Sequence, residues 1–150
     1  MTRILYVLLI VLSFSYCKKK KTVDQAAKDE EIITKYIADK GLAAKGTGSG
    51  LYYVISTEGT GAQPSSNSSI KVNYKGYLTD GTVFDQSKTA GYTTSLSNVI
   101  KGWQEGIPYF KKGGKGILLI PSALGYGKQA QGSIPANSVL IFEVELIDVY

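Results

Sequence analysis

Residues 72–87, with the sequence V-N-Y-K-G-Y-L-T-D-G-T-V-F-D-Q-S, decide the fold. From Ile70 to Leu78, the even-numbered positions are apolar, aromatic or glycine, whereas the odd-numbered positions are mostly polar. This alternation predicts a strand whose even-numbered face is buried. Asp80-Gly81 is a two-residue hairpin signal, so the chain should turn back along this strand. We therefore expect Phe84 to lie near Tyr74 on a shared face.

Further strands and one short helix are predicted on both sides of this hairpin. Leu51–Ser56 is rich in β-branched and aromatic residues, and Val139–Val149 has the length and alternation of a central strand. Residues 97–107 predict a short helix, but its two glycines and Pro108 disfavour it in isolation, so packing around Trp103 must hold it. The sequence therefore predicts an α+β domain, with one short helix against an antiparallel sheet.

The composition excludes most chemistry that depends on histidine, thiols or metals. The chain of 150 residues has no histidine and one cysteine, so it offers neither a Ser-His-Asp triad nor metal-ligand spacing. Four of the positive charges behind the net charge of +5 come from Lys18–Lys21, which gives little support to nucleic-acid binding. Asp29–Glu31 is expected to be an exposed acidic run, and residues 112–116 a turn. We therefore expect no metal or other cofactor.

The N-terminus indicates export. Ile4–Tyr16 is a mostly apolar run of 13 residues, shorter than the roughly 20 that cross a bilayer, and it is typical of a signal peptide over residues 1–16. Cys17 follows directly and resembles the lipidated first residue of a bacterial lipoprotein. The alternatives are a plain signal peptide or an uncleaved anchor. The expected location is the periplasm or outer membrane, with Lys18–Lys21 either at anionic lipid head groups or in a solvated spacer.

A helical arm is predicted before the domain. Asp24–Lys40 starts with an aspartate that can cap a helix, has apolar residues at helical spacing in its second half, and is followed by Gly41. The small, Gly-rich residues 43–50 predict a flexible linker or loop. We expect a tether, arm and linker over residues 17–48 and the working domain over residues 49–150. The arm should dock on the domain or pair with a second copy, so monomer and dimer both remain open.

Four segments resemble one known family, in the family's order and at its spacing. They are V-N-Y-K-G-Y-L-T-D-G-T-V-F-D (72–85), V-I-K-G-W-Q-E-G (99–106), L-I-P-S-A-L-G-Y-G (119–127) and S-I-P-A-N-S-V-L-I-F-E-V-E-L (133–146). Together they are similar to the FKBP-type peptidyl-prolyl cis-trans isomerases. The resemblance implies a half-open antiparallel sheet of five or six strands, wrapped around the short helix, with the active site between them.

The resemblance also implies a proline-binding pocket. Trp103 would form its floor, and the backbone N–H of Ile100 and the hydroxyl of Tyr126 would each bind a substrate carbonyl. Asp85 would orient Tyr74 and polarise the pocket. The expected catalytic residues are Tyr74, Phe84, Asp85, Tyr126 and Phe142, and the expected substrate-binding residues are Val99, Ile100, Trp103, Ile134 and Tyr92. A further aromatic position of the family falls on Thr94.

The implied function is acceleration of X-Pro isomerisation while exported proteins fold. The implied partners are unfolded or partly folded polypeptides that contain proline. The alternative is a non-catalytic module that binds proline-containing partners, or a holdase chaperone. Thr94, Pro108 and the loop over residues 88–95 depart from the better-known members of the family, which bears on this choice.

Overall fold

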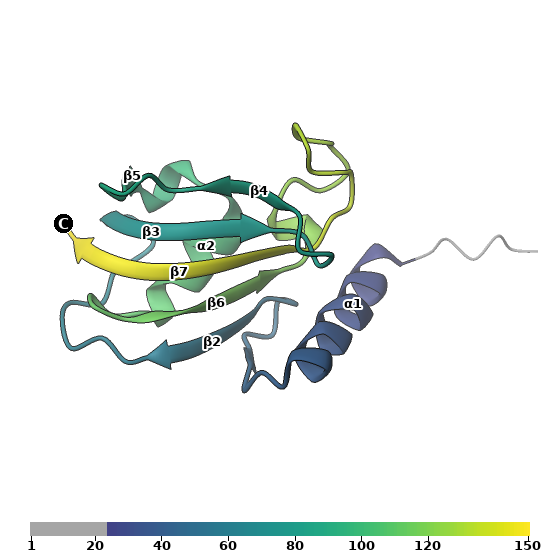
Figure 1. Cartoon of the computed structure of the whole chain (residues 1–150), viewed down its shortest axis with the longest axis horizontal. Coiled ribbons are helices and arrows are strands. Elements are labelled where there is room, and N and C mark those ends of the chain that lie inside the picture. The colour runs from purple at the N-terminus through teal and green to yellow at the C-terminus, as the bar shows by residue number, and fades with distance from the viewer. Residues whose placement is uncertain (1–23) are drawn as a thin grey trace, which may run out of the picture.

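The computed structural model describes residues 24–150, which form one antiparallel sheet with helices against it (Figure 1). The strands are β1 (Lys45–Gly46), β2 (Tyr52–Thr57), β3 (Ser69–Tyr77), β4 (Val83–Gln86), β5 (Tyr92–Ser95), β6 (Lys115–Ile120) and β7 (Leu140–Val149). Their order is β1-β2-β6-β7-β3-β4, and β5 also pairs with β3. The predicted α+β fold is confirmed. The sheet has seven strands, not five or six, and one of them is only two residues long.

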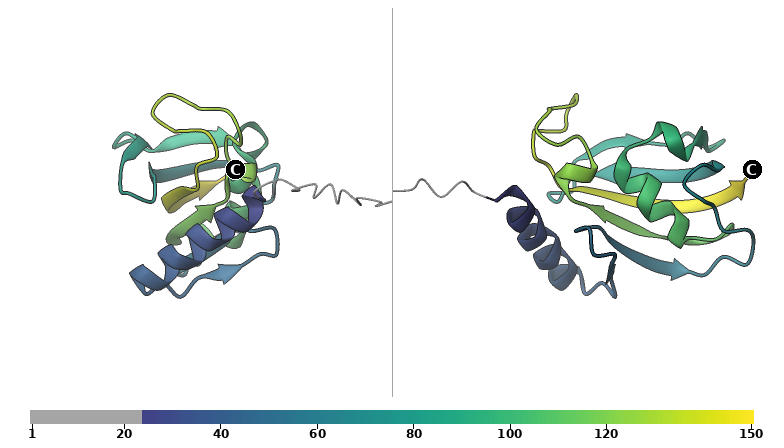
Figure 2. Two further views of the ribbon diagram at one scale, coloured as in Figure 1. Left: turned by 90° about the vertical axis from the view of Figure 1, so that its right-hand side faces the viewer. Right: turned by 180° about the vertical axis from the view of Figure 1, so that it is seen from behind.

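The terminal strand lies inside the sheet, as predicted. β7 pairs with β6 on one side and with β3 on the other. Alternate residues of β7 are buried in the main core, as a strand with one core face requires. These residues are Leu140, Phe142, Val144 and Leu146. The helix α2 (Lys101–Gly106) covers this face (Figure 2), so β7 and α2 together form the centre of the domain.

The hairpin between β3 and β4 turns through three residues, so the predicted two-residue turn was wrong. The N–H of Gly81 donates to the carbonyl of Leu78, and the N–H of Leu78 donates to the carbonyl of Thr82. Thr79, Asp80 and Gly81 are therefore the loop residues. Gly81 has a φ of 90°, the left-handed conformation that ends a three-residue hairpin loop. The Asp-Gly pair located the turn correctly but did not fix its length.

The glycines of α2 allow the helix to lie unusually close to the sheet. A Cβ on Gly102 would lie 2.4 Å from Cγ2 of Ile120, and one on Gly106 would lie 2.6 Å from Cδ2 of Leu118. The side chains of Leu118 and Ile120, both in β6, are fully buried. The residues that weaken α2 by propensity are thus the ones that let it pack. 3₁₀ turns at Leu96–Asn98 (η1) and Ile107–Tyr109 (η2) lead into and out of the helix.

Replacing Gly102 with Ala is expected to destabilise the protein by about 2 kcal/mol, because the added methyl overlaps a buried side chain. In an exposed helix the same change would stabilise by about 1 kcal/mol, so the sign of the effect is informative. Urea unfolding measures it. Lys101→Ala, at an exposed position of α2, is the control and should change stability by less than about 0.5 kcal/mol. A Gly102→Ala protein as stable as the wild type would contradict this packing.

The helical arm docks at one end of the sheet (Figures 1 and 2). In α1 (Gln25–Lys40), Ile33 is fully buried against Leu119 and Val139. The segment after α1, expected to be a linker or loop, is tied to the domain. The hydroxyls of Thr47 and Ser49 each donate to Oε1 of Glu105 in α2, both at 2.6 Å.

One acidic residue of α1 is buried. Asp29 is only 1% exposed, so the expectation of an exposed acidic run over Asp29–Glu31 was wrong at this position. Asp29 lies four residues before Ile33, so helical periodicity places it on the docked face. No helix within residues 24–150 has the length and apolarity to cross a membrane. The predicted signal peptide, Cys17 and Lys18–Lys21 lie outside the described residues.

Candidate functional site

A cavity of about 500 Å³ lies between α2, the sheet and the chain that joins η3 (Ser122–Leu124) to β7. All ten residues predicted for the pocket line it: Tyr74, Phe84, Asp85, Tyr92, Val99, Ile100, Trp103, Tyr126, Ile134 and Phe142. They come from β3, β4, β5, β7, α2 and the loops beside them. The fold therefore brings together side chains that are up to 68 residues apart in the sequence, counting from Tyr74 to Phe142.

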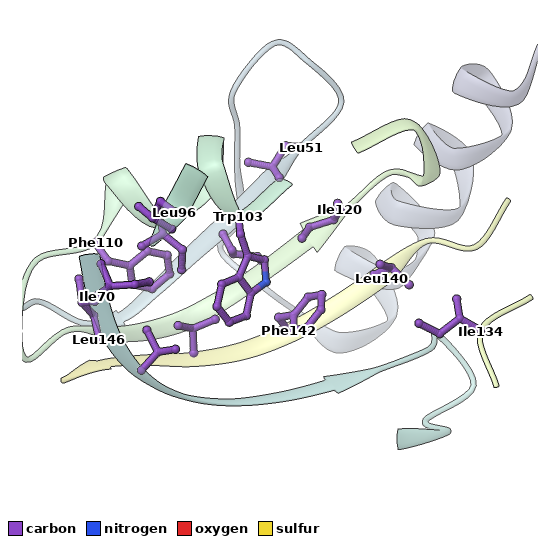
Figure 3. Packing of buried hydrophobic residues seen from close by; sticks show 14 residues of the cluster. Leu51, Ile70, Leu96, Trp103, Phe110, Ile120, Ile134, Leu140, Phe142 and Leu146 are labelled. Carbon is purple, nitrogen blue, oxygen red and sulfur yellow. The ribbon is translucent and has the colours of Figure 1, made fainter. Parts of the chain in front are cut away.

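Aromatic rings form the inner part of the cavity. Trp103 is 4% exposed and makes edge-to-face contacts with Tyr74, at 5.2 Å between ring centroids, and with Phe142, at 5.3 Å. Figure 3 shows Trp103 and Phe142 side by side. Phe84 packs edge-on against Phe142 at 5.4 Å. Edge-to-face packing fixes the orientation of each ring as well as its distance. The indole is therefore held in place from two sides.

Gly76 makes room for this arrangement. A Cβ at this position would lie 2.5 Å from Cε2 of Phe84 and 2.8 Å from Cε1 of Phe142. Glycine thus lets both rings lie directly on β3. Phe84 and Tyr74 line the same cavity, in agreement with the shared face that the hairpin predicts, and the ring that Phe84 meets edge-on is that of Phe142.

Asp85 brings charge to the rim of the cavity. The hydroxyl of Tyr74 donates to Oδ2 of Asp85 at 2.8 Å, and the N–H of Gln86 donates to Oδ1 at 2.8 Å. Burial, followed by the hydrogen bond to Asp85, raises the pKa of Tyr74. Burial and the charge of Asp85 also raise the pKa of Tyr126. Both tyrosine hydroxyls therefore keep their protons well into the alkaline range.

Hydrogen-bond donors are available around the rings. Within residues 24–150, the N–H of Ile100 has no hydrogen-bonded protein acceptor, and the hydroxyl of Tyr126 has none either. Tyr126 is 38% exposed. The cavity thus combines an apolar floor with donors that a bound carbonyl can reach.

The edge of the cavity includes the predicted residue Tyr92 and several residues that the sequence did not indicate. Tyr92 lines it and lies 5.9 Å from Tyr74 between ring centroids, whereas Thr94, two residues along β5, is not among the lining residues. The additional lining residues are Asn98, Gln131, Gly132 and Ser133. Asn98 ends the 3₁₀ turn η1, and the other three lie in the segment between η3 and β7. The position of such short turns and loops depends on tertiary contacts and has no sequence period. Their only signal was their place in the sequence: Asn98 directly precedes V-I-K-G-W, Gln131 and Gly132 directly precede S-I-P, and Ser133 is its first residue.

Within the described part of the chain, no group of three or more His, Cys, Asp or Glu residues is arranged to hold a metal ion. The arrangement of the cavity suits a peptide: the apolar rings can contact a compact apolar side chain, and the N–H and O–H donors can donate to backbone carbonyls. A half-open sheet around a short helix, with such a cavity between them, is the fold that the sequence resemblance implied. A sequence profile described as FKBP-type peptidyl-prolyl cis-trans isomerase matches residues 60–147. The chain belongs to this family.

Named relatives support the assignment. The chain is 44% identical over 133 residues to the FKBP-type peptidyl-prolyl cis-trans isomerase FkpA of Escherichia coli, a match that covers 87% of this chain and 48% of the relative. Its identity to FkpA of Aeromonas hydrophila is 43% over 132 residues, with the same two shares. The chain therefore spans about half the length of the curated relatives it matches.

Solved structures agree with this comparison. The crystal structure of E. coli FkpA gives a TM-score of 0.74 at 44% identity, covering 84% of this chain and 59% of that one. A peptidyl-prolyl cis-trans isomerase from Pseudomonas syringae pv. tomato also gives 0.74, at 34% identity, and the match covers 83% of this chain and 92% of that one. The fold thus matches both a longer relative and one of similar extent.

Proposed function

We propose that this protein is a peptidyl-prolyl cis-trans isomerase that binds proline in the aromatic cavity. The observation that supports this most is the set of rings around the buried Trp103, edged by free donors and one carboxylate. The proposed catalytic residues are Tyr74, Phe84, Asp85, Tyr126 and Phe142. The proposed substrate-binding residues are Val99, Ile100, Trp103, Ile134 and Tyr92.

The reaction needs no proton transfer. Rotation about an X-Pro bond sacrifices amide resonance, at a barrier of roughly 20 kcal/mol, and takes tens to hundreds of seconds without a catalyst. In the twisted transition state the amide loses charge separation, so its carbonyl needs less water than in the planar ground state. An apolar floor at Trp103 therefore favours the twisted form. The N–H of Ile100 and the hydroxyl of Tyr126 would hold the flanking carbonyls and select conformers close to it.

A proline-isomerisation assay on peptides that differ in the residue before proline tests this proposal. The full chain should accelerate the cis-to-trans step in proportion to its concentration. A folded protein without acceleration would contradict the enzymatic function. If a folded but inactive protein still bound proline-containing peptides, the non-catalytic binding module would replace the enzyme as the proposed function.

The rate should be almost independent of pH between about 6 and 9. Histidine is the side chain that ordinarily titrates in this range, and the chain contains none. The raised pKa values of Tyr74 and Tyr126 mean that these hydroxyls stay protonated, and remain donors, beyond the upper limit. Measuring kcat/KM across the range checks this. A bell-shaped profile centred near neutrality would contradict a mechanism without proton transfer.

We further propose that the protein acts outside the cytoplasm, on exported polypeptides, and is anchored through a lipid on Cys17. The support is the 13-residue apolar run Ile4–Tyr16 and the cysteine directly after it. Radioactive palmitate supplied to cells should label the wild type but not Cys17→Ala. Equal labelling of both proteins would contradict the anchor, and so would absence of label from the exported wild type.

A further inference from the structure

The buried carboxylate of Asp29 accepts hydrogen bonds from Ser122, the first residue of η3 (Ser122–Leu124). This 3₁₀ turn precedes Tyr126 and is called the Ser122 turn below. Oδ2 of Asp29 accepts from the backbone N–H of Ser122 at 2.8 Å and from its hydroxyl at 2.6 Å. Oδ1 accepts from the side-chain amide of Gln25 at 2.7 Å. Asp29 and Ser122 are 1% and 2% exposed. A residue of the N-terminal arm is therefore joined, away from water, to a residue 93 positions later.

Ser122 passes this constraint to the chain on both sides of Tyr126. The carbonyl of Ser122 accepts from the N–H of Gly125 at 3.0 Å and from the N–H of Gly127 at 2.8 Å. The carbonyl of Gly127 in turn accepts from the N–H of Asn137 at 2.7 Å, in the segment that leads into β7. Gly125 and Gly127, the two neighbours of Tyr126, thus both donate to the carbonyl of Ser122. Asp29 in turn holds Ser122 in place.

We propose that Asp29 and Ser122 are positioning residues, through which the docked helix α1 sets the place of the Tyr126 hydroxyl in the cavity. This inference rests on the proposed isomerase function. Asp29 touches neither the cavity nor a substrate, and it acts only through the Ser122 turn. The N-terminal arm is then part of the working site, although it lies before the matched family segment that begins at residue 60.

Docking alone does not explain a carboxylate at this position. The apolar contacts of Ile33 with Leu119 and Val139 already attach α1, and the hydroxyl of Tyr52 donates to Glu30 on the same helix. Burying a carboxylate is unfavourable unless several donors compensate for its lost water. Its donors here include both polar hydrogens of Ser122. An aliphatic residue would dock the helix but would leave the turn unfixed.

Three variants of the full chain separate positioning from docking. Asp29→Ala removes both bonds to Ser122 and should lower kcat/KM about fivefold. Asp29→Asn keeps an oxygen that can accept both bonds, and Gln25 can rotate to present its oxygen to the new amide, so this variant should recover most of the rate. Tyr52→Phe is the matched control: it removes another hydrogen bond between α1 and the sheet, far from the Ser122 turn in sequence, and should stay within about twofold of the wild type.

Two readouts distinguish a positioning role from a general loss of stability. Amide exchange at Gly125 and Gly127 should speed up in Asp29→Ala but not in Tyr52→Phe, whether or not the protein is an enzyme. In a double-mutant cycle, Asp29→Ala should have little further effect on kcat/KM once Tyr126 is replaced by Phe, because both changes affect the same hydroxyl.

The outcomes also separate this inference from the proposed function. An inactive wild type would contradict the isomerase function, and amide exchange would then decide whether Asp29 fixes the turn. With an active wild type, an unchanged rate in Asp29→Ala would overturn the inference. Independent, multiplying effects of Asp29→Ala and Tyr126→Phe would overturn it as well, and so would equal effects of Asp29→Ala and Tyr52→Phe.

Discussion

Asp85→Val is expected to lower kcat/KM for X-Pro isomerisation at least about tenfold while the protein stays folded. Valine is a compact side chain somewhat larger than aspartate, and it cannot accept the hydrogen bond from Tyr74, which is 2.8 Å long. Hydrogen bonds to charged groups contribute about 1.5–3 kcal/mol, and each tenfold change in rate corresponds to about 1.4 kcal/mol. Because Asp85 is exposed, its loss empties no part of the core.

The reason for a large effect is that one carboxylate serves two tyrosines. It orients the Tyr74 ring, which contacts Trp103 edge-on, and its charge reaches the hydroxyl of Tyr126. Tyr74→Phe keeps the ring but removes the same hydrogen bond, so it should reproduce part of the Asp85→Val loss. The effects of the two substitutions should not add, because they break one shared contact.

Asp39→Val is the control, because Asp39 is exposed on α1 and pairs only with Lys35 across one helical turn. Exposed pairs of this kind contribute at most about 1 kcal/mol to stability, and this pair is remote from the cavity. Its kcat/KM should match the wild type. If Asp85→Val kept the wild-type rate and Tyr74→Phe did too, the reacting bond would lie elsewhere than in the proposed pocket.

Periodic and motif signals predicted the centre of the molecule. The alternation around Tyr74 and along Val139–Val149 defines which face of a strand is buried, because side chains in a strand alternate strictly. The short helix around Trp103 has two glycines that disfavour it in isolation, so the sequence predicted that Trp103 packs into the core and holds the helix there. These features depend on neighbours in the sequence, or on spacing that the family shares, and the fold expected from them is the one observed.

Contacts between distant segments could not be predicted in the same way. Asp29 looked like part of an acidic surface because its neighbours are charged, and its partner Ser122 lies 93 residues away. The length of the hairpin at Asp80-Gly81 depended on which carbonyl accepts from Gly81, a choice made by the pairing of β3 and β4. The glycines of α2 looked like weak points until Ile120 gave them a packing role.

Gly116→Ala is expected to destabilise the protein by about 3 kcal/mol or more, which exceeds the effect expected of Gly102→Ala. A Cβ at Gly116 would lie 1.8 Å from the carbonyl oxygen of Val54 and 2.9 Å from Cε1 of Phe110. Overpacking a core usually costs about 1–3 kcal/mol when side chains can move. The nearest atom here belongs to the backbone of β2, so relief requires β2 and β6 to separate at the point where Ile55 pairs with Gly116.

The consequence should reach the cavity, because β6 supports α2. Its residues Leu118 and Ile120 contact the glycines of that helix, and α2 holds Trp103. Domains of this size are stable by about 5–15 kcal/mol, so a loss of 3 kcal/mol removes a large share of the total.

Gly46→Ala is the matched control, because Gly46 is exposed at the edge of the sheet. The nearest atom to its new Cβ is a ring carbon of Tyr52 at 3.2 Å, and this ring can shift slightly. Urea unfolding should show a change below about 1 kcal/mol for Gly46→Ala. Equal midpoints for the two variants would mean that β2 and β6 yield at Gly116 far more easily than their pairing implies.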